Sequence, residues 1–154
     1  MLQELTYEQL LKQEDELVFD TFNNDIAFEL GMKIVERAKK EKKIIAVCVS
    51  FGRQILFQYG FIGFGPDAEN WIRRKSNMVY EYHRSSMAVL TKWNNAGDGY
   101  EKFGRSPADF ALVGGAFPIR IKDIGVIGAI TVTGMPHWED HEYVTTAIKE
   151  YLEK

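Results

Sequence analysis

The strongest constraint on the fold of this chain comes from two apolar, β-branched segments that each have a strand-like neighbour a few residues away. Residues 44–49 form one continuous apolar run, and a glycine turn separates them from residues 54–59. Residues 126–133 form the second run, and another glycine turn joins them to residues 119–122. Such short connections join antiparallel strands, because parallel neighbours need a crossover of a dozen or more residues. The sequence therefore predicts two hairpins in a largely antiparallel sheet.

Helical patterns fill most of the remaining chain. Apolar residues recur every three or four positions, and residues that commonly cap helices precede several of these stretches. Gly31, inside the second helix, predicts close packing against a neighbour. The expected helices are residues 7–18 after a Thr6 cap, residues 24–38, a long helix from Asp67 or Asn70 to about Leu90, and residues 138–152. This order predicts an α+β fold in one domain, residues 1–154, with helices packed on the sheet.

Composition excludes several classes of protein. The chain has 154 residues, with 19 Lys and Arg against 22 Asp and Glu, for a formal charge of −3. This slight acidity argues against a nucleic-acid-binding protein, which usually carries a strongly basic face. No apolar run approaches the ~20 residues of a membrane-spanning helix, and the start of the chain lacks a basic, then apolar, signal sequence. With a single cysteine, Cys48, no internal disulfide forms, and we expect a cytoplasmic location.

The expected long helix carries most of the candidate binding residues. Near its start, Trp71-Ile72-Arg73-Arg74-Lys75 combines an aromatic ring with three cations. Arginine can hold carboxylates or phosphates with its planar fork, and Ser85 and Ser86 add hydroxyl groups further along. The alternative is a solvated helix face with a core tryptophan, because most charged side chains lie in solvent.

Three other motifs have structural as well as functional interpretations. The pair Gly114-Gly115 lacks the ending of a phosphate-binding loop and no helix follows it, so it indicates positive φ or a close backbone approach, with which a position at the rim of a pocket is also compatible. His137 and His141 lack the spacing of the known zinc motifs and have no evident third ligand, so no metal site is predicted. Cys48 lies in the middle of a strand, which favours a core residue over a nucleophile.

Five segments spread along the chain carry a further pattern: Asn70-Trp71-Ile72-x-Arg74-Lys75-x-Asn77-x-Val79, Ser85-Ser86, Gly114-Gly115-Ala116-Phe117-Pro118-Ile119, Gly128-Ala129-Ile130-Thr131-Val132-Thr133-Gly134-Met135-Pro136 and Asp140-His141. In these segments the chain resembles the UPF0303 family, a branch of the haem-degrading, HbpS-like and GlcG-like (DUF336) superfamily. The resemblance implies a profilin-like or PAS-like fold, a central antiparallel sheet with helices around it. It also implies a homo-oligomer, and it makes haem the one cofactor suggested.

Three hypotheses about function follow. The first is a homo-oligomeric binding protein for haem or a small anionic metabolite, with a site formed by Trp71, Arg74, Lys75, Ser85, Ser86, Gly114 and Gly115. An aromatic wall with cations suits a flat anion. The second is an enzyme acting on haem or an oxidised small molecule, although no catalytic residue can be named. The third is a structural or adaptor oligomer in which the same motif forms a subunit interface.

Overall fold

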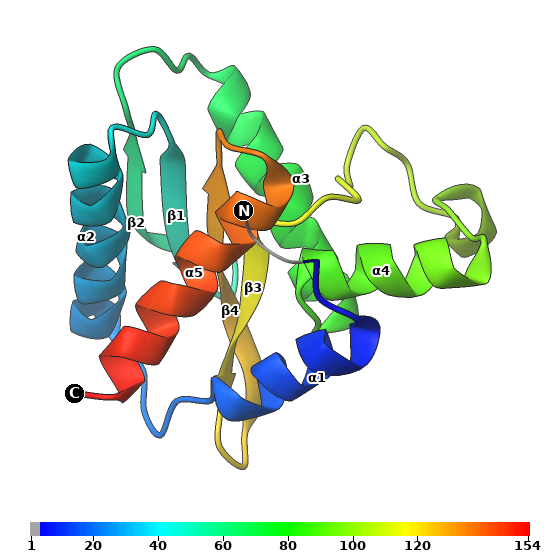
Figure 1. Ribbon diagram of the computed structural model, residues 1–154, viewed down its shortest axis with the longest axis horizontal. Coiled ribbons are helices and arrows are strands. Elements are labelled where there is room, and N and C mark those ends of the chain that lie inside the picture. Colours follow the sequence, from blue (N-terminus) through cyan, green and yellow to red (C-terminus); the bar gives the residue numbers. More distant parts are fainter. Residues whose placement is uncertain (1–3) are drawn as a thin grey trace.

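The computed structural model describes residues 4–154 and shows an α+β arrangement with helices around a central sheet (Figure 1). Its elements in chain order are α1 (Tyr7–Glu16), α2 (Asn24–Glu41), β1 (Ala46–Phe51), β2 (Gln54–Gly60), α3 (Asp67–Tyr82), α4 (Ser86–Ala96), the 3₁₀ turn Glu101–Phe103, β3 (Ala116–Ile121), β4 (Gly125–Thr133) and α5 (His137–Leu152). No helix among these combines the length and the apolar character that a membrane crossing requires.

The sheet confirms both predicted hairpins. Its strand order is β2-β1-β4-β3, and every neighbouring pair is antiparallel. The first hairpin is β1–β2 and the second is β3–β4, so the two hairpins join through their inner strands β1 and β4. The predicted α+β fold with an antiparallel sheet is therefore confirmed, and β2 and β3 are its two edges.

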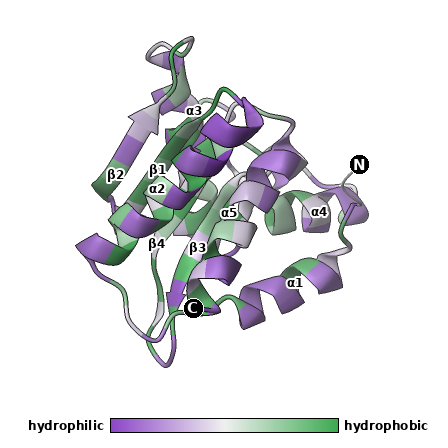
Figure 2. Ribbon diagram, turned by 60° about the vertical axis from the view of Figure 1, so that its left-hand side comes forward, coloured by the Kyte–Doolittle hydropathy of each residue, from purple (hydrophilic) through white to green (hydrophobic). Residues whose placement is uncertain are grey.

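Helices cover the two faces of the sheet differently. On one face, α2 and α5 pack over the sheet and bury the main core, which includes Val47, Phe117 and Ile130. On the other face, α3 packs across β1, β4 and β3 and buries smaller side chains such as Ala46, Cys48 and Ala129. Figure 2 shows the central strands mainly in hydrophobic colours, with hydrophilic stretches on the surrounding helices.

The prediction of one long helix to about Leu90 was wrong. The chain leaves the helix at His83, whose φ of 54° is left-handed, and α4 starts three residues later in another direction (Figure 1). Ser85 caps α4 by accepting a hydrogen bond from the N–H of Ala88 at 3.1 Å. Apolar residues on both sides of the break keep helical spacing, and that spacing hid the capping serine between them.

The prediction about Gly31 is confirmed. A Cβ atom at this position would overlap the ring of Phe57, so the missing side chain lets α2 lie directly against β2. The same ring contacts Phe28 edge-on at 6.0 Å between centroids. The outer strand β2 is therefore held to α2 mainly by aromatic packing.

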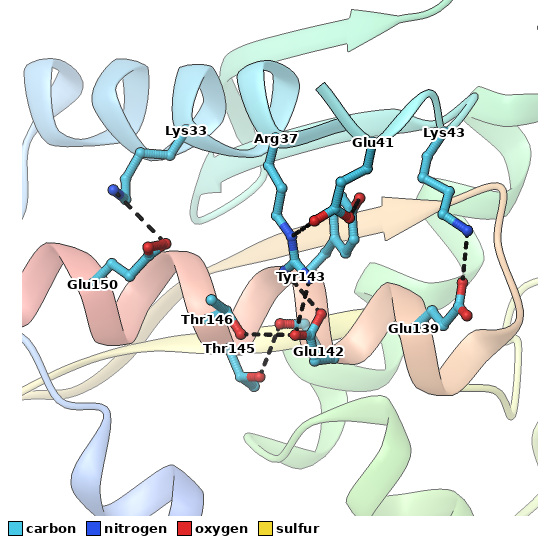
Figure 3. Close-up of polar contacts among 10 residues, drawn as sticks. All are labelled: Lys33, Arg37, Glu41, Lys43, Glu139, Glu142, Tyr143, Thr145, Thr146 and Glu150. Atoms are coloured by element: carbon cyan, nitrogen blue, oxygen red, sulfur yellow. Dashed lines mark hydrogen bonds and ion pairs between the residues drawn. The ribbon is translucent and has the colours of Figure 1, made fainter. Parts of the chain in front are cut away.

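Polar contacts along one side join α2 to α5 (Figure 3). The Arg37 guanidinium lies over the ring of Tyr143 at 3.9 Å and pairs with Glu142 at 2.8 Å and Glu41 at 3.1 Å. Tyr143 donates a hydrogen bond to Glu41. The pKa of the Tyr143 hydroxyl is raised, mainly by burial and to a smaller extent by this bond. Two more exposed pairs flank this centre, Lys33 with Glu150 and Lys43 with Glu139. These contacts fix the two helices that cover the main core.

Candidate functional site

A groove of about 310 Å³ lies between α3 and the β1–β2 hairpin. The hairpin supplies Cys48, Ser50, Arg53, Ile55 and Gln58. Helix α3 supplies Glu69, Ile72, Arg73, Ser76, Asn77 and Tyr80. The volume is at the lower end of the range for small-molecule sites, roughly 300–1,000 Å³.

The floor of the groove combines hydroxyl groups with small apolar surfaces. The hydroxyls of Ser50 and Tyr80 share a hydrogen bond of 2.6 Å, which ties the strand to the helix. The hydroxyl of Ser76 is bonded to Thr131 at 2.7 Å. Cys48 and Ile72 pack together between these polar groups. A ligand here would meet hydroxyl groups and apolar surface at once.

Arg53 is the cation best placed to receive a ligand. It lies in the turn between β1 and β2, with its side chain exposed and its guanidinium over the Tyr80 ring at 4.7 Å. One of its nitrogens donates to Asn77 at 3.0 Å, and no carboxylate among the described residues forms an ion pair with it. Arg73 differs, because Asp109 pairs with it at 3.1 Å. Arg53 therefore has the charge and the free donors that a carboxylate needs.

Neither potential nucleophile in the groove is activated. Burial raises the pKa of the Cys48 thiol to about 11, so the thiol is protonated at neutral pH. Burial also raises the pKa of Tyr80, and its bond to Ser50 opposes this only in part. Both groups are neutral, so they serve as hydrogen-bond partners and packing surface, which agrees with the predicted core role of Cys48.

Lys75 lies inside the protein and is only 2% exposed. Its ammonium donates to Asp140 at 2.9 Å and to the Val132 carbonyl at 3.0 Å. Burial lowers the pKa of Lys75 and raises that of Asp140 to about 6, and their mutual attraction opposes both shifts. A Cβ atom at Gly115 would approach the Lys75 nitrogen and the Val132 carbonyl closely. Gly115, with φ of 130°, thus provides the room for this buried ion pair.

Gly114 is packed just as closely. Its N–H donates to Nδ1 of His137 at 3.0 Å, and a Cβ atom there would meet the carbonyl of His137 and the Met87 side chain. His141, which is 4% exposed, is bonded through Nε2 to Gln13 at 2.7 Å. Of the two interpretations of the glycine pair, the structure shows close backbone packing.

Trp71 and Arg74 lie on the side of α3 that faces the segment before β3. The Arg74 guanidinium stacks on the Trp71 ring at 4.4 Å and donates to the Pro107 carbonyl at 2.9 Å. The Arg74 carbonyl accepts from the N–H of Ala111 at 3.1 Å, and Asn77 donates to the Asp109 carbonyl at 2.7 Å. These motif residues therefore hold the segment 106–111 against the helix.

Ser85 and Ser86 point in different directions. The backbone and hydroxyl of Ser85 both donate to the buried carboxylate of Glu14, at 3.2 and 3.1 Å. The Ser86 hydroxyl accepts from the N–H of Ala116 at 3.1 Å, at the start of β3. One serine therefore fixes α1, and the other fixes the edge of the sheet.

The seven predicted site residues do not converge on one pocket. Lys75 and Gly115 meet at the buried ion pair, and Arg74 stacks on Trp71, whereas Ser85, Ser86 and Gly114 each make separate contacts. Of the described residues that line the groove, none belongs to the predicted set. The binding role of the seven residues stays a prediction.

The groove and the predicted residues use different stripes of the same helix, α3. Ile72, Ser76 and Tyr80 recur every four residues and line the groove, one position away from Trp71 and Lys75. The signal that marks them is two hydroxyl residues at helical spacing from a buried isoleucine. Arg53, in the hairpin turn, carries no comparable signal.

A second depression of about 530 Å³ lies between α1 and α5. Its lining includes both lysines and glutamates: Lys12, Lys149, Glu16, Glu142 and Glu153. The described residues of its lining include no aromatic side chain, whereas in the groove at α3 the Arg53 guanidinium lies over the Tyr80 ring, so that groove is the better candidate for a planar anion.

Comparisons with known proteins support a family assignment. Residues 22–149 match the family model described as haem degrading protein HbpS-like. A UPF0303 protein of Rhizobium etli is 40% identical over 146 residues, which cover 95% of this chain and 89% of the relative. The chain belongs to the UPF0303 family and carries an HbpS-like domain.

Solved structures share the UPF0303 fold. The crystal structure of Ybr137w matches with a TM-score of 0.90 and 25% identity, covering 97% of this chain and 90% of that one. The structure of PduOC in complex with haem matches with a TM-score of 0.68 and 16% identity, covering 85% of this chain and 94% of that one. The second likeness is one of fold, and the haem it contains is a property of PduOC.

Proposed function

We propose that this UPF0303 protein is a binding protein whose groove at α3 takes the carboxylate of a small planar ligand. The ligand is either a compact anionic metabolite or a haem held through a propionate. The observation that carries the proposal is Arg53, an exposed guanidinium stacked on Tyr80 at the mouth of the groove. A planar cation with free donors, beside hydroxyls and apolar surface, suits an unsaturated carboxylate.

Haem fits this groove through its carboxylates better than through its iron. Of the usual axial ligands of haem iron, the described lining contains Cys48 and Tyr80, and burial raises the pKa of both. His83, His137 and His141 lie outside the lining. A macrocycle would also extend beyond a groove of about 310 Å³. The proposal therefore rests on recognition of a carboxylate, and the two possible ligands are haem and a smaller anion.

The position of Lys75 argues against the alternative in which the helix motif forms a subunit interface. Lys75 is enclosed within one chain, with its ammonium bonded to Asp140 and Val132, so it does not present its charge to another subunit. For the enzyme alternative, the groove offers no activated nucleophile. Binding is the function that the arrangement of residues favours.

The test is a titration of the purified protein with hemin, followed by Soret absorbance, and with benzoate, followed by calorimetry. Replacing Arg53 with glutamine removes the cation at the mouth of the groove. The matched control is Lys122→Gln, which removes an exposed cation from the remote β3–β4 turn. We expect at least a tenfold weaker affinity in Arg53→Gln, about 1.4 kcal/mol, and no change in the control.

Hemin and benzoate distinguish the two ligand classes that the proposal allows. A saturable Soret shift that weakens in Arg53→Gln identifies haem, and benzoate binding alone identifies a smaller carboxylate. Equal affinities in both variants, or no binding of either probe, would overturn the proposal.

A further inference from the structure

The groove at α3 has opposite charges at its two ends. Two cross-strand rows of the hairpin form one of its walls, because Cys48 faces Gln58 and Ser50 faces Ile55. Successive rows on one face of a sheet lie about 7 Å apart along the strand. The exposed carboxylate of Glu69 accepts a hydrogen bond from Gln58 at 3.1 Å. Glu69 therefore lies at the row that contains Cys48.

Arg53 lies at the other end of the groove. It donates to Asn77 at 3.0 Å, and its guanidinium covers the ring of Tyr80, whose hydroxyl is bonded to Ser50. Asn77 follows Glu69 by eight positions in α3, which is a rise of roughly 12 Å along the helix. In the described part of the chain, neither Arg53 nor Glu69 forms an ion pair. Both charges are therefore available to a ligand.

The other charged side chain of the lining, Arg73, is already paired. Its guanidinium bonds to Asp109 at 3.1 Å and to the side chain of Asn70 at 3.1 Å. Neither of these partners lines the groove. Because Asp109 balances Arg73, the end of the groove at Glu69 has a net negative charge. The end at Arg53 has a net positive charge.

Between the two ends, the groove is uncharged. Ile72 supplies apolar surface there, beside the protonated thiol of Cys48. The hydroxyl of Ser76 is bonded to Thr131 at 2.7 Å, so it has a partner within the fold. A ligand in this groove gains charge complementarity at the ends, and its middle meets neutral surface.

We infer that Glu69 determines specificity and that the groove takes a small zwitterion, with a carboxylate at Arg53 and an ammonium group at Glu69. This inference rests on the proposed function for the carboxylate end. Both contacts are charge-assisted hydrogen bonds, the stronger kind. A molecule with carboxylates at both ends meets repulsion at Glu69. Of the two ligands that the proposal allows, the compact metabolite fits this arrangement better, because the charged side groups of haem are both carboxylates.

The test varies only the charge at the far end of a one-ring ligand. The three probes are 4-(aminomethyl)benzoate, which adds a cation, benzoate, which adds no second charge, and terephthalate, which adds a carboxylate. We expect their affinities for wild type, measured by calorimetry, to fall in that order. The first and the last should differ about tenfold, because one modest attraction and one modest repulsion both contribute to that difference.

Glu69→Gln removes the charge and keeps an oxygen that can accept from Gln58. The difference between 4-(aminomethyl)benzoate and terephthalate should then shrink to about threefold or less. Asp67→Asn is the matched control, since it removes an exposed carboxylate from the same first turn of α3, outside the groove lining. It should leave the order and the spread unchanged. Damage to the fold would weaken all three probes alike, so the change in selectivity reports the charge itself.

Three results would overturn the inference: equal affinities of wild type for the three probes, tightest binding of terephthalate, or an unchanged spread in Glu69→Gln. In each of these cases the proposed function stands if benzoate binding still weakens in Arg53→Gln. If none of the three probes binds, the zwitterion site is wrong, and the hemin titration alone then decides the proposed function.

Discussion

The two edge strands of the sheet, β3 and β2, differ in whether their outward backbone groups are hydrogen-bonded. Along β3, bonds from Ser86 and Phe19 and the ring of Pro118 leave little free for another strand. Along β2, the backbone groups of Gln58 and Gly60 face outward with no partner in the described part of the chain. The difference teaches that this chain satisfies the backbone groups of one edge by its own folding and leaves those of the other edge exposed.

The buried polar groups and the groove lie on different sides of the sheet. The β3 side contains the buried groups Lys75, Asp140, Glu14 and His141, each held by specific hydrogen bonds. The β2 side contains the solvent-facing groove with Arg53. Buried charges need fixed partners, whereas a binding groove needs a group that is still free to accept one. The protected side therefore stabilises the fold, and the open side is available for function.

The largest expected effect comes from breaking the ion pair on the protected side. Asp140→Asn leaves the Lys75 ammonium buried without its counter-charge, which should cost about 3–5 kcal/mol in the free energy of unfolding. Urea denaturation measures it. The control Glu139→Gln removes a partly exposed pair with Lys43 at 3.8 Å and should cost no more than about 1 kcal/mol. Equal losses in the two variants would show that the buried pair has no special role.

A somewhat smaller change is expected in the pH dependence of the free energy of unfolding. Burial, with a contribution from His137, lowers the pKa of His141 from 6.5 to about 4. Between these values the unfolded chain binds a proton that the folded protein does not, so stability should rise with pH across this window. We expect wild type to gain up to roughly 3 kcal/mol over His141→Gln between pH 4 and pH 6.5.

The comparison with His141→Gln isolates this residue from its neighbour. Asp140 has a pKa raised to about 6 and contributes the opposite slope, because the folded protein retains a proton there that the unfolded chain loses. That contribution is present in both proteins and cancels in the difference. A flat difference across the window would mean that His141 is not buried as described.

The smallest effect concerns the β3 edge itself. Ser86→Ala removes the acceptor for the buried N–H of Ala116 and should cost roughly 1–3 kcal/mol. Hydrogen exchange at Ala116 should accelerate by a matching factor. Ser106→Ala, which loses an exposed contact to Ala108, is the matched control and should change stability by less than about 0.5 kcal/mol. Unchanged exchange at Ala116 would show that Ser86 does not seal this edge.

Local patterns predicted most of the elements but none of the residues that line the groove at α3. The hairpins, the Thr6 cap and the close packing at Gly31 depend on neighbouring residues or on one missing side chain. Local patterns do not predict the groove, because Arg53 and Tyr80 are far apart in the chain and meet only when the hairpin lies against α3. The hydrogen bond from Arg74 to the Pro107 carbonyl is likewise a contact between distant segments.

By itself, the sequence determined the antiparallel sheet, the positions of most helices and the family, since turn residues, hydrophobic periodicity and motifs are local properties. Only the tertiary structure decided that α3 ends at His83 and that Lys75 is enclosed with Asp140. It also decided which stripe of α3 lines a groove and which edge of the sheet stays open. The physical reason is that burial and pairing depend on segments that are distant in sequence, and the same side chain can bind a ligand or hold a loop according to what packs against it.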